Sequence, residues 1–173
     1  MRIATMAAIC AAAVFGIAAA DPARPAPPFQ MRQLNGHTVS FSQYRGKVLA
    51  VAFILTTCPH CQDLTRVLMP LAREYAPRGV QFLECAFNDD AERTIPEFLD
   101  QFHPPFPVGW SNQAAVRAYL HYSILDPRLF VPHMIFLDRA GVVRGDFPGE
   151  NDFFKQPEAN IRAQLEKMLK SPH

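Results

Sequence analysis

Residues 47–61 read KVLAVAFILTTCPHC, an apolar run that is followed after two threonines by a Cys-Pro-His-Cys motif. A continuous apolar run of this length, without alternation, is typical of a strand that is buried on both faces of a sheet. Residues 59–75 then place apolar side chains at helical spacing, although Pro70 within them is expected to kink or split the helix. The stretch therefore predicts that Cys58 lies where a buried strand passes into a helix.

The rest of the chain predicts further strands and helices around this unit. Residues 29–34 and 38–41 flank Asn35-Gly36, a strong signal for a β-hairpin turn. Other strands are expected over 79–87, 134–138 and 142–147, other helices over 94–102 (with Pro96 in its first turn), 112–122 and 157–169, and a rigid connection over 103–107. Strands that alternate with helices predict an α/β fold, with a central mixed sheet flanked by helices and an N-terminal β-hairpin extension.

Composition predicts one globular domain. The 173 residues are 49% hydrophobic and 19% charged, which is a globular and not a disordered composition. Lys and Arg number 17 against 16 Asp and Glu, so the net charge of +1 leaves almost no excess of basic residues with which to neutralise phosphates. We therefore expect no nucleic-acid partner. The domain is expected over 29–173, after a stiff Pro-rich linker over 21–28.

Residues 1–20 are predicted to be a signal peptide. Arg2 precedes an Ala-rich apolar run, and the small residues Ala18-Ala19-Ala20 match a signal peptidase site with cleavage after Ala20. This predicts a periplasmic or secreted protein, in a compartment where disulfides persist. The alternative is an uncleaved anchor that holds the domain on the periplasmic side, since about 18 apolar residues approach the length of a span. Membrane contact is expected only in that case.

The Cys-Pro-His-Cys motif carries the chemistry. A helix N-terminus offers unpaired N–H groups and a partial positive charge, which favour the thiolate of Cys58 over its thiol and make it a nucleophile. Pro59 suits the first helical position. His60 adds a hydrogen-bond donor, and a positive charge when protonated. Cys61 lies one turn on, within reach of a disulfide bond with Cys58, and a stabilised thiolate makes such a pair more oxidising.

Simpler explanations of the cysteines are weaker. A structural zinc site normally needs two pairs of ligands, and no second Cys-x-x-Cys follows. A static disulfide across so short a loop would constrain the unfolded chain little. We therefore expect a redox-active or metal-handling pair. Cys85, within a predicted strand, is expected to be a buried and inert thiol.

From about residue 29 to the last helix, the chain resembles the thioredoxin-like superfamily, and most of all the exported redoxins of the TlpA/ResA type, which belong with the AhpC/TSA-like proteins. The resemblance rests on Asn35-Gly36, Gly46-Lys47, the strand over 48–55, Cys58 to Cys61, Val131-Pro132, and a strand over 134–138 that ends in Asp138 before Gly141. The Pro-His dipeptide between the cysteines, and Val131 before the proline, are similar to DsbA-type oxidases.

The resemblance implies an extracytoplasmic thiol-disulfide oxidoreductase. Cys58 and Cys61 would exchange disulfides with partner proteins, a second partner would reset the pair, and no cofactor is implied. The Val131–Pro132 peptide bond would be cis, and would lie against the cysteines with a backbone edge toward the partner. The direction stays open, because the overall pattern favours a reductase and the Pro-His dipeptide an oxidant.

The chain departs from these relatives at several positions. Thr57 replaces the usual tryptophan before the first cysteine, and His133 follows the proline where threonine is common. The connection over 122–132 is a few residues longer. Redoxins of this type often keep a proton-moving carboxylate beneath the cysteines, and Asp89 matches that region better than Glu84.

Two alternative functions remain at this point. His133 is expected to point toward Cys58 and Cys61, and two thiols with an imidazole can bind copper, as in the Sco-type chaperones of the same superfold. The Sco cysteines are spaced by three residues instead of two. A thiol peroxidase is a weaker alternative, because Leu55 stands where peroxiredoxins carry a threonine.

Overall fold

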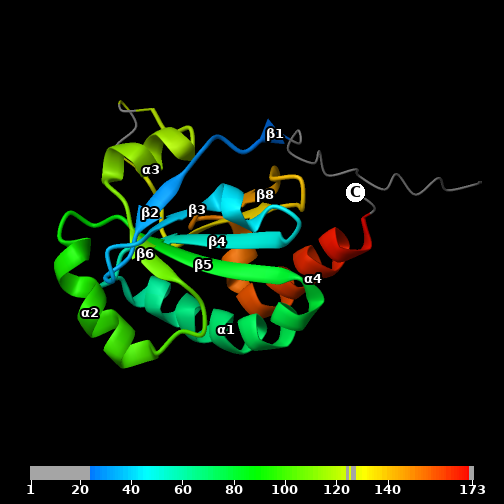
Figure 1. Ribbon diagram of the computed structural model, residues 1–173, viewed down its shortest axis with the longest axis horizontal. Coiled ribbons are helices and arrows are strands. Elements are labelled where there is room, and N and C mark those ends of the chain that lie inside the picture. The colour runs from blue at the N-terminus through cyan, green and yellow to red at the C-terminus, as the bar shows by residue number, and fades with distance from the viewer. Residues whose placement is uncertain (1–23, 124, 126–127, 172–173) are drawn as a thin grey trace, which may run out of the picture.

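The computed structural model describes residues 24–123, 125 and 128–171, which form one mixed sheet with helices on both faces (Figure 1). The predicted signal peptide lies outside the described residues. The strands are β1 (Arg24–Pro25), β2 (Gln30–Arg32), β3 (Thr38–Ser40), β4 (Val48–Ile54), β5 (Val80–Ala86), β6 (Val108–Trp110), β7 (His133–Leu137) and β8 (Val142–Phe147). The helices are α1 (Pro59–Tyr75), α2 (Ala91–Phe102), α3 (Gln113–Tyr119) and α4 (Pro157–Lys170), with short 3-10 turns at Phe41–Tyr44, Ala76–Arg78 and Asp152–Lys155.

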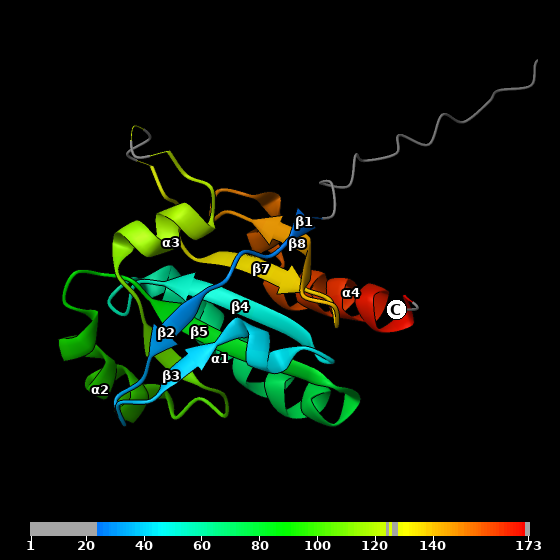
Figure 2. The same cartoon turned by 45° about the horizontal axis from the view of Figure 1, so that its top comes forward.

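Strand β4 lies at the centre of the sheet, whose order is β1-β8-β7-β4-β5-β6-β2-β3 (Figure 2). It pairs in parallel with β5 and antiparallel with β7. All of its residues are buried, which accounts for the continuous apolar run in the sequence. The expected α/β class, the N-terminal hairpin of β2 and β3, and the strand–helix unit around the cysteines are therefore confirmed.

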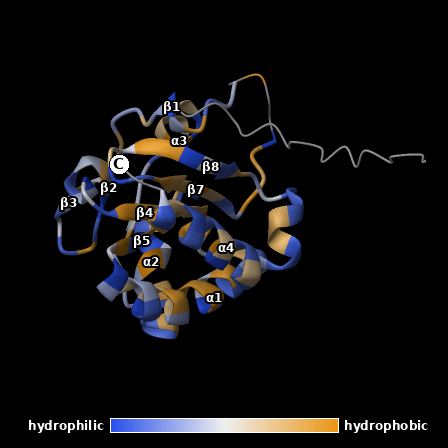
Figure 3. Ribbon diagram, turned by 90° about the vertical axis from the view of Figure 1, so that its right-hand side faces the viewer, coloured by the Kyte–Doolittle hydropathy of each residue, from blue (hydrophilic) through white to orange (hydrophobic). Residues whose placement is uncertain are grey.

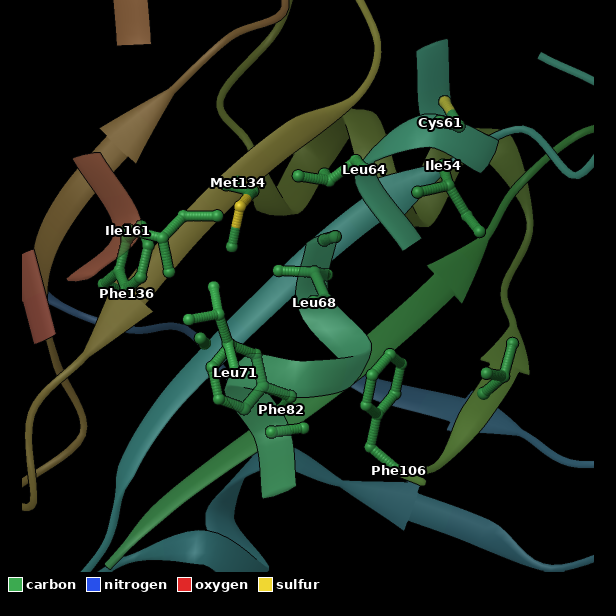
Figure 4. Packing of buried hydrophobic residues seen from close by; sticks show 14 of the residues in the cluster. Ile54, Cys61, Leu64, Leu68, Leu71, Phe82, Phe106, Met134, Phe136 and Ile161 are labelled. Atoms are coloured by element: carbon green, nitrogen blue, oxygen red, sulfur yellow. The ribbon is translucent and has the colours of Figure 1, made fainter. Parts of the chain in front are cut away.

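The sheet separates two hydrophobic clusters. One contains residues of α1, α2 and α4 together with the side chains of β4, β5 and β7 that point toward them, among them Cys61, Leu64 and Met134 (Figure 4). The other joins the opposite face to α3 and the β2–β3 hairpin. In Figure 3 the central strands are coloured mostly as hydrophobic, whereas the helices mix hydrophobic and hydrophilic residues. We call these two sides the α1 face and the α3 face.

Several elements differ from the sequence expectation. Helix α1 continues through Pro70 and is not split, because its apolar stripe packs along the α1 face on both sides of the proline. Helix α2 begins at Ala91 and not at residue 94. The Thr94 amide already donates to the Asp90 carbonyl in the first helical hydrogen bond. Pro96 therefore lies in the second turn of the helix and not in the first.

Two short strands were not expected. In β6, a Cβ atom on Gly109 would clash with the carbonyl oxygen of Arg32, so only glycine allows β6 and β2 to pair this closely. Strand β1 comes from the segment expected to be a linker, and Pro25 is tolerated there because an edge strand has no need of its amide. Both strands are too short to show a periodic pattern.

Candidate active site

Cys58 is the N-cap residue of α1. Its amide donates to the carbonyl oxygen of Leu55 over 3.1 Å, and its own carbonyl accepts the first helical hydrogen bond, from Gln62, over 3.0 Å. Its backbone is extended, Pro59 follows at the first helical position, and its side chain is half-buried. The sulfur therefore stands at the junction of β4 and α1, as the sequence predicts, beside the unpaired N–H groups of the first turn.

Cys61 is the inner thiol of the pair. It is completely buried on the α1 face, whereas Cys58 is partly open to solvent, and both are free thiols. Burial raises the pKa of Cys61 well above its usual value; the Leu55 backbone opposes this, and the neighbouring Cys58 thiol and the charge of Glu84 add to it. Cys61 thus holds its proton while Cys58 faces the solvent.

The turn before Cys58 is held by a set of polar side chains that the sequence reasoning missed. The Asn88 side chain accepts from the amide of Thr56 over 3.2 Å and donates to its hydroxyl over 3.1 Å. The side-chain Nε2 of Gln62 donates to the Thr56 carbonyl over 2.9 Å. Asn88 is itself held by bonds to Asp90 and Thr94. These contacts attach the cysteine loop to the first turn of α2.

A buried carboxylic acid lies beneath the cysteines. Glu84 is completely buried in the middle of β5, and it shares the α1 face with Phe82 because side chains alternate along a strand. Its Oε1 lies 2.8 Å from the Thr65 hydroxyl, which in turn lies 3.1 Å from the carbonyl oxygen of Cys61. Its Oε2 has no hydrogen-bond partner in the part of the chain that the structure describes. Burial raises the pKa of Glu84 to about 8, against a smaller opposing effect of the Thr65 hydrogen bond.

The local hydrogen bonds agree with a protonated Glu84. The Thr65 hydroxyl has one proton and lies between two acceptors, the Cys61 carbonyl and the Glu84 carboxylate. When Glu84 is protonated, the acid can donate to Thr65, and Thr65 to Cys61, so that all three groups are satisfied. Near neutral pH this carboxyl group is therefore able both to accept and to release a proton.

Asp89 does not lie beneath the cysteines, and the sequence preference for it over Glu84 is wrong. Strand β5 ends at Ala86, and Asp89 follows in an exposed loop. There it lines an open cavity of about 570 Å³ with Arg32 and Trp110. The acid whose charge acts on Cys61 is Glu84, which lies within β5.

The Val131–Pro132 peptide bond is cis, as the resemblance implies. Residue 133 pairs with Phe53 near the end of β4, so this peptide lies beside the chain that leads to Cys58. Gly149 packs directly against this peptide. A Cβ atom on Gly149 would lie 2.8 to 2.9 Å from three backbone atoms of Val131. His60 and Thr57, on the cysteine side, are exposed.

His133 does not join the cysteines, which corrects the expectation for a copper site. Its side chain is buried on the α3 face, where Nε2 lies 2.6 Å from Oδ1 of Asp146. The physical reason is the alternation along β7, which turns Met134 toward α1 and His133 the other way. Among the described residues, no three His, Cys, Asp or Glu side chains are arranged to hold a metal ion.

Comparison with known proteins agrees with this arrangement. The model of the Redoxin family matches residues 21–165. The chain belongs to the Redoxin family. Among the curated redoxin relatives, the thiol-disulfide oxidoreductase ResA of Oceanobacillus iheyensis is 28% identical over 96 residues, which are 53% of this chain and 50% of ResA. ResA of Bacillus thuringiensis subsp. konkukian is 22% identical over 147 residues, 85% of this chain and 76% of that protein.

Solved structures show the same thioredoxin-like fold. A thiol:disulfide interchange protein of the thioredoxin family from Chlorobium tepidum superposes with a TM-score of 0.70 at 22% identity, over 86% of this chain and 98% of that one. The expected fold class is therefore confirmed. Within the part of this redoxin that the structure describes, no helix is both long enough and apolar enough to span a bilayer.

Proposed function

We propose that this redoxin is an extracytoplasmic thiol-disulfide oxidoreductase that exchanges disulfides with partner proteins through Cys58 and Cys61. The observation that carries the proposal is the arrangement of two free thiols at a helix N-terminus, one accessible and one buried, above a carboxylic acid with a raised pKa. ResA relatives bear the same activity in their names.

The exchange takes place in two displacements. The Cys58 thiolate attacks one sulfur of a partner disulfide, so that the partner S–S bond breaks and its second sulfur leaves as a thiolate that takes up a proton. Cys61 then loses its proton and attacks Cys58, which releases the first partner sulfur. The partner gains two electrons and leaves as a dithiol, and the Cys58–Cys61 pair, which has lost those two electrons, is left as a disulfide. The reverse sequence donates a disulfide.

Glu84 supports the second displacement. Burial opposes ionisation of Cys61, so the attack needs a nearby group that takes its proton. With its pKa raised to about 8, Glu84 is ionised in a fraction of the molecules near neutral pH. In those molecules the carboxylate can receive the Cys61 proton, and it can return the proton when the pair is reduced. Thr65 bridges Glu84 and the Cys61 backbone and so holds the acid beneath the motif.

The Val131–Pro132 peptide is proposed to bind the backbone of the partner beside Cys58. Its position next to the end of β4 and its support by Gly149 favour this role. The apolar N-terminal segment favours export, by cleavage after Ala20 or with retention as an anchor. A second protein that resets the cysteine pair completes the cycle.

Reduction of insulin by dithiothreitol tests the proposal. Cys58→Ser is expected to reduce the catalysed rate to the uncatalysed background, because the attacking sulfur is removed. Cys85→Ser is the matched control, since Cys85 is buried on the opposite face, and it should retain the activity of the unaltered protein. Full turnover by Cys58→Ser would refute the mechanism.

A further inference from the structure

His133 is the first residue after Pro132, and it opens a charged network on the α3 face. Its Nε2 atom lies 2.6 Å from Oδ1 of Asp146 on β8, and the Tyr122 ring meets the imidazole edge-on at 5.9 Å between ring centres. Only 2% of the His133 side chain is exposed. A polar side chain buried this deeply, next to the proposed partner-binding peptide, is held by specific partners.

The network continues from Asp146 to the N-terminal strand. Oδ2 of Asp146 accepts from Arg24 of β1 over 2.8 Å, and the same guanidinium lies 2.9 Å from Nε2 of His121 at the end of α3. Exposure falls from 30% at Arg24 to 16% at Asp146. The chain of contacts therefore runs from the surface to the buried start of β7, and joins four separate segments.

The charges in the network are balanced. Burial alone would raise the pKa of Asp146, but its hydrogen bonds and charge interactions with His133 and Arg24 outweigh this and hold it below its usual value. Arg24 supplies a positive charge on one side of the Asp146 carboxylate, and Nε2 of His133 donates to its other oxygen. Nδ1 of His133 has no hydrogen-bond partner among the described residues, so the contact of Nε2 with Asp146 is the one that holds the ring.

We propose that Arg24, Asp146 and His133 form a positioning relay for disulfide exchange, in which strand β1 holds the Val131–Pro132 peptide in its partner-binding position. The inference rests on the proposed function. Strand β1 spans only Arg24 and Pro25, and besides its pairing with β8 it is attached by the Ala26 amide, which donates to the Gly141 carbonyl over 3.0 Å. The ion pair to Asp146 connects this short strand to the residue after Pro132.

The test uses Arg24→Gln in the full chain, with insulin as the substrate. The KM for insulin is expected to rise about fivefold, the factor that about 1 kcal/mol makes in an equilibrium. The kcat should change less than about twofold, because the cysteines and Glu84 are untouched. Arg24→Lys keeps the positive charge, so its KM for insulin should lie between those of Arg24→Gln and the unaltered protein. The control is Arg144→Gln, which removes another β8 ion pair, with Asp138, at the far end of the β7–β8 hairpin.

Hydrogen exchange of the reduced proteins gives a readout that does not depend on activity. Arg24→Gln should speed exchange across residues 129–133, and Arg144→Gln should not. An unchanged KM together with unchanged exchange would overturn the relay, and so would a rise in KM equal in both variants. If the unaltered protein shows no Cys58-dependent insulin reduction, the proposed function fails, and faster exchange in Arg24→Gln alone would still support the positioning contact.

Discussion

Each face of the sheet holds an acid, and the two acids have opposite electrostatic surroundings. On the α1 face, Glu84 is completely buried with one hydroxyl partner, and no described residue bonds its second carboxyl oxygen. On the α3 face, Asp146 is bonded at one oxygen to His133 and at the other to Arg24. Burial raises the pKa of Glu84 to about 8, whereas charged and hydrogen-bonding neighbours hold that of Asp146 below its usual value.

The difference shows how one fold separates proton transfer from positioning. An acid without a counter-charge changes its protonation near neutral pH, and it lies beneath the thiol that must lose a proton. An acid with a counter-charge keeps its charge over the same pH range, and it lies beside the peptide that must stay in place.

The largest effect is expected from Cys61→Ser on the α1 face. Turnover of insulin should fall about a thousandfold, because an intramolecular displacement by a neighbouring thiol is replaced by slow attack from solution. The mixed disulfide between Cys58 and the partner should accumulate, and mass spectrometry under non-reducing conditions would detect it. Cys85→Ser serves as the control. Rapid release of the partner from Cys61→Ser would show that another group resolves the intermediate.

Glu84→Gln is expected to change how stability depends on pH. The folded chain keeps the Glu84 proton up to about pH 8, whereas an unfolded chain releases it near pH 4.3. The stability contributed by the neutral acid is therefore complete below about pH 4.3 and is lost as pH rises toward 8, by about 1.4 kcal/mol per pH unit. Urea unfolding of the reduced proteins from pH 5 to 9 measures this. The free energy of unfolding should decline with pH in the unaltered protein and should not show this decline in Glu84→Gln.

The control for this series is Glu92→Gln, which alters an exposed acid in the first turn of α2. Its unfolding free energy should follow that of the unaltered protein across the pH range. Glu84→Gln should also slow the second displacement at pH 7, because the proton acceptor for Cys61 is gone. Parallel stability curves for Glu84→Gln and the unaltered protein would show that Glu84 does not titrate in this window.

Asp146→Asn on the α3 face should lower the free energy of unfolding by about 2 kcal/mol, because Arg24 and His133 lose their charged acceptor. The loss should be constant between pH 6 and 9, since the pKa of Asp146 lies below its usual value and the carboxylate is ionised throughout. Urea unfolding at three pH values would measure it. A loss that grows or shrinks steeply across that range would contradict the assignment of a fixed charge.

The smallest effect is expected from Gly149→Ala, which presses a methyl group against the backbone of Val131. Thermal unfolding should show a loss of about 1 kcal/mol, and the KM for insulin should rise. Gly145→Ala is the control, because its nearest neighbours are the side chains of Phe147, Gln164 and Phe136 and not backbone. It should leave KM unchanged, and an equal rise in both variants would remove Gly149 from the partner site.

The sequence was informative where a pattern repeats along the chain. The apolar run of β4 and the helical spacing after Cys58 predicted the strand–helix junction, and the Asn-Gly turn predicted the hairpin. The sequence favoured Asp89 over Glu84, because alternation shows that Glu84 and Phe82 share a face of the sheet but not that α1 covers that face. His133 was assigned to the wrong face for the same reason.

Contacts between distant segments were also beyond the sequence. Arg24 and Asp146 are 122 positions apart, and nothing in either neighbourhood indicates an ion pair. Asn88 likewise follows β5 as an ordinary loop residue, and its bonds to Thr56 depend on how β4 and β5 pair. Such side chains acquire their roles only when the sheet has formed.

The location of Cys85 has a consequence for maturation of the chain. Its sulfur is sealed within the cluster of the α3 face, so the sheet itself stands between it and Cys61. Once β4 and β5 have paired, oxidative folding of the domain can link only one combination of its three described cysteines. The sheet therefore prevents Cys85 from forming a non-native disulfide with Cys58 or Cys61.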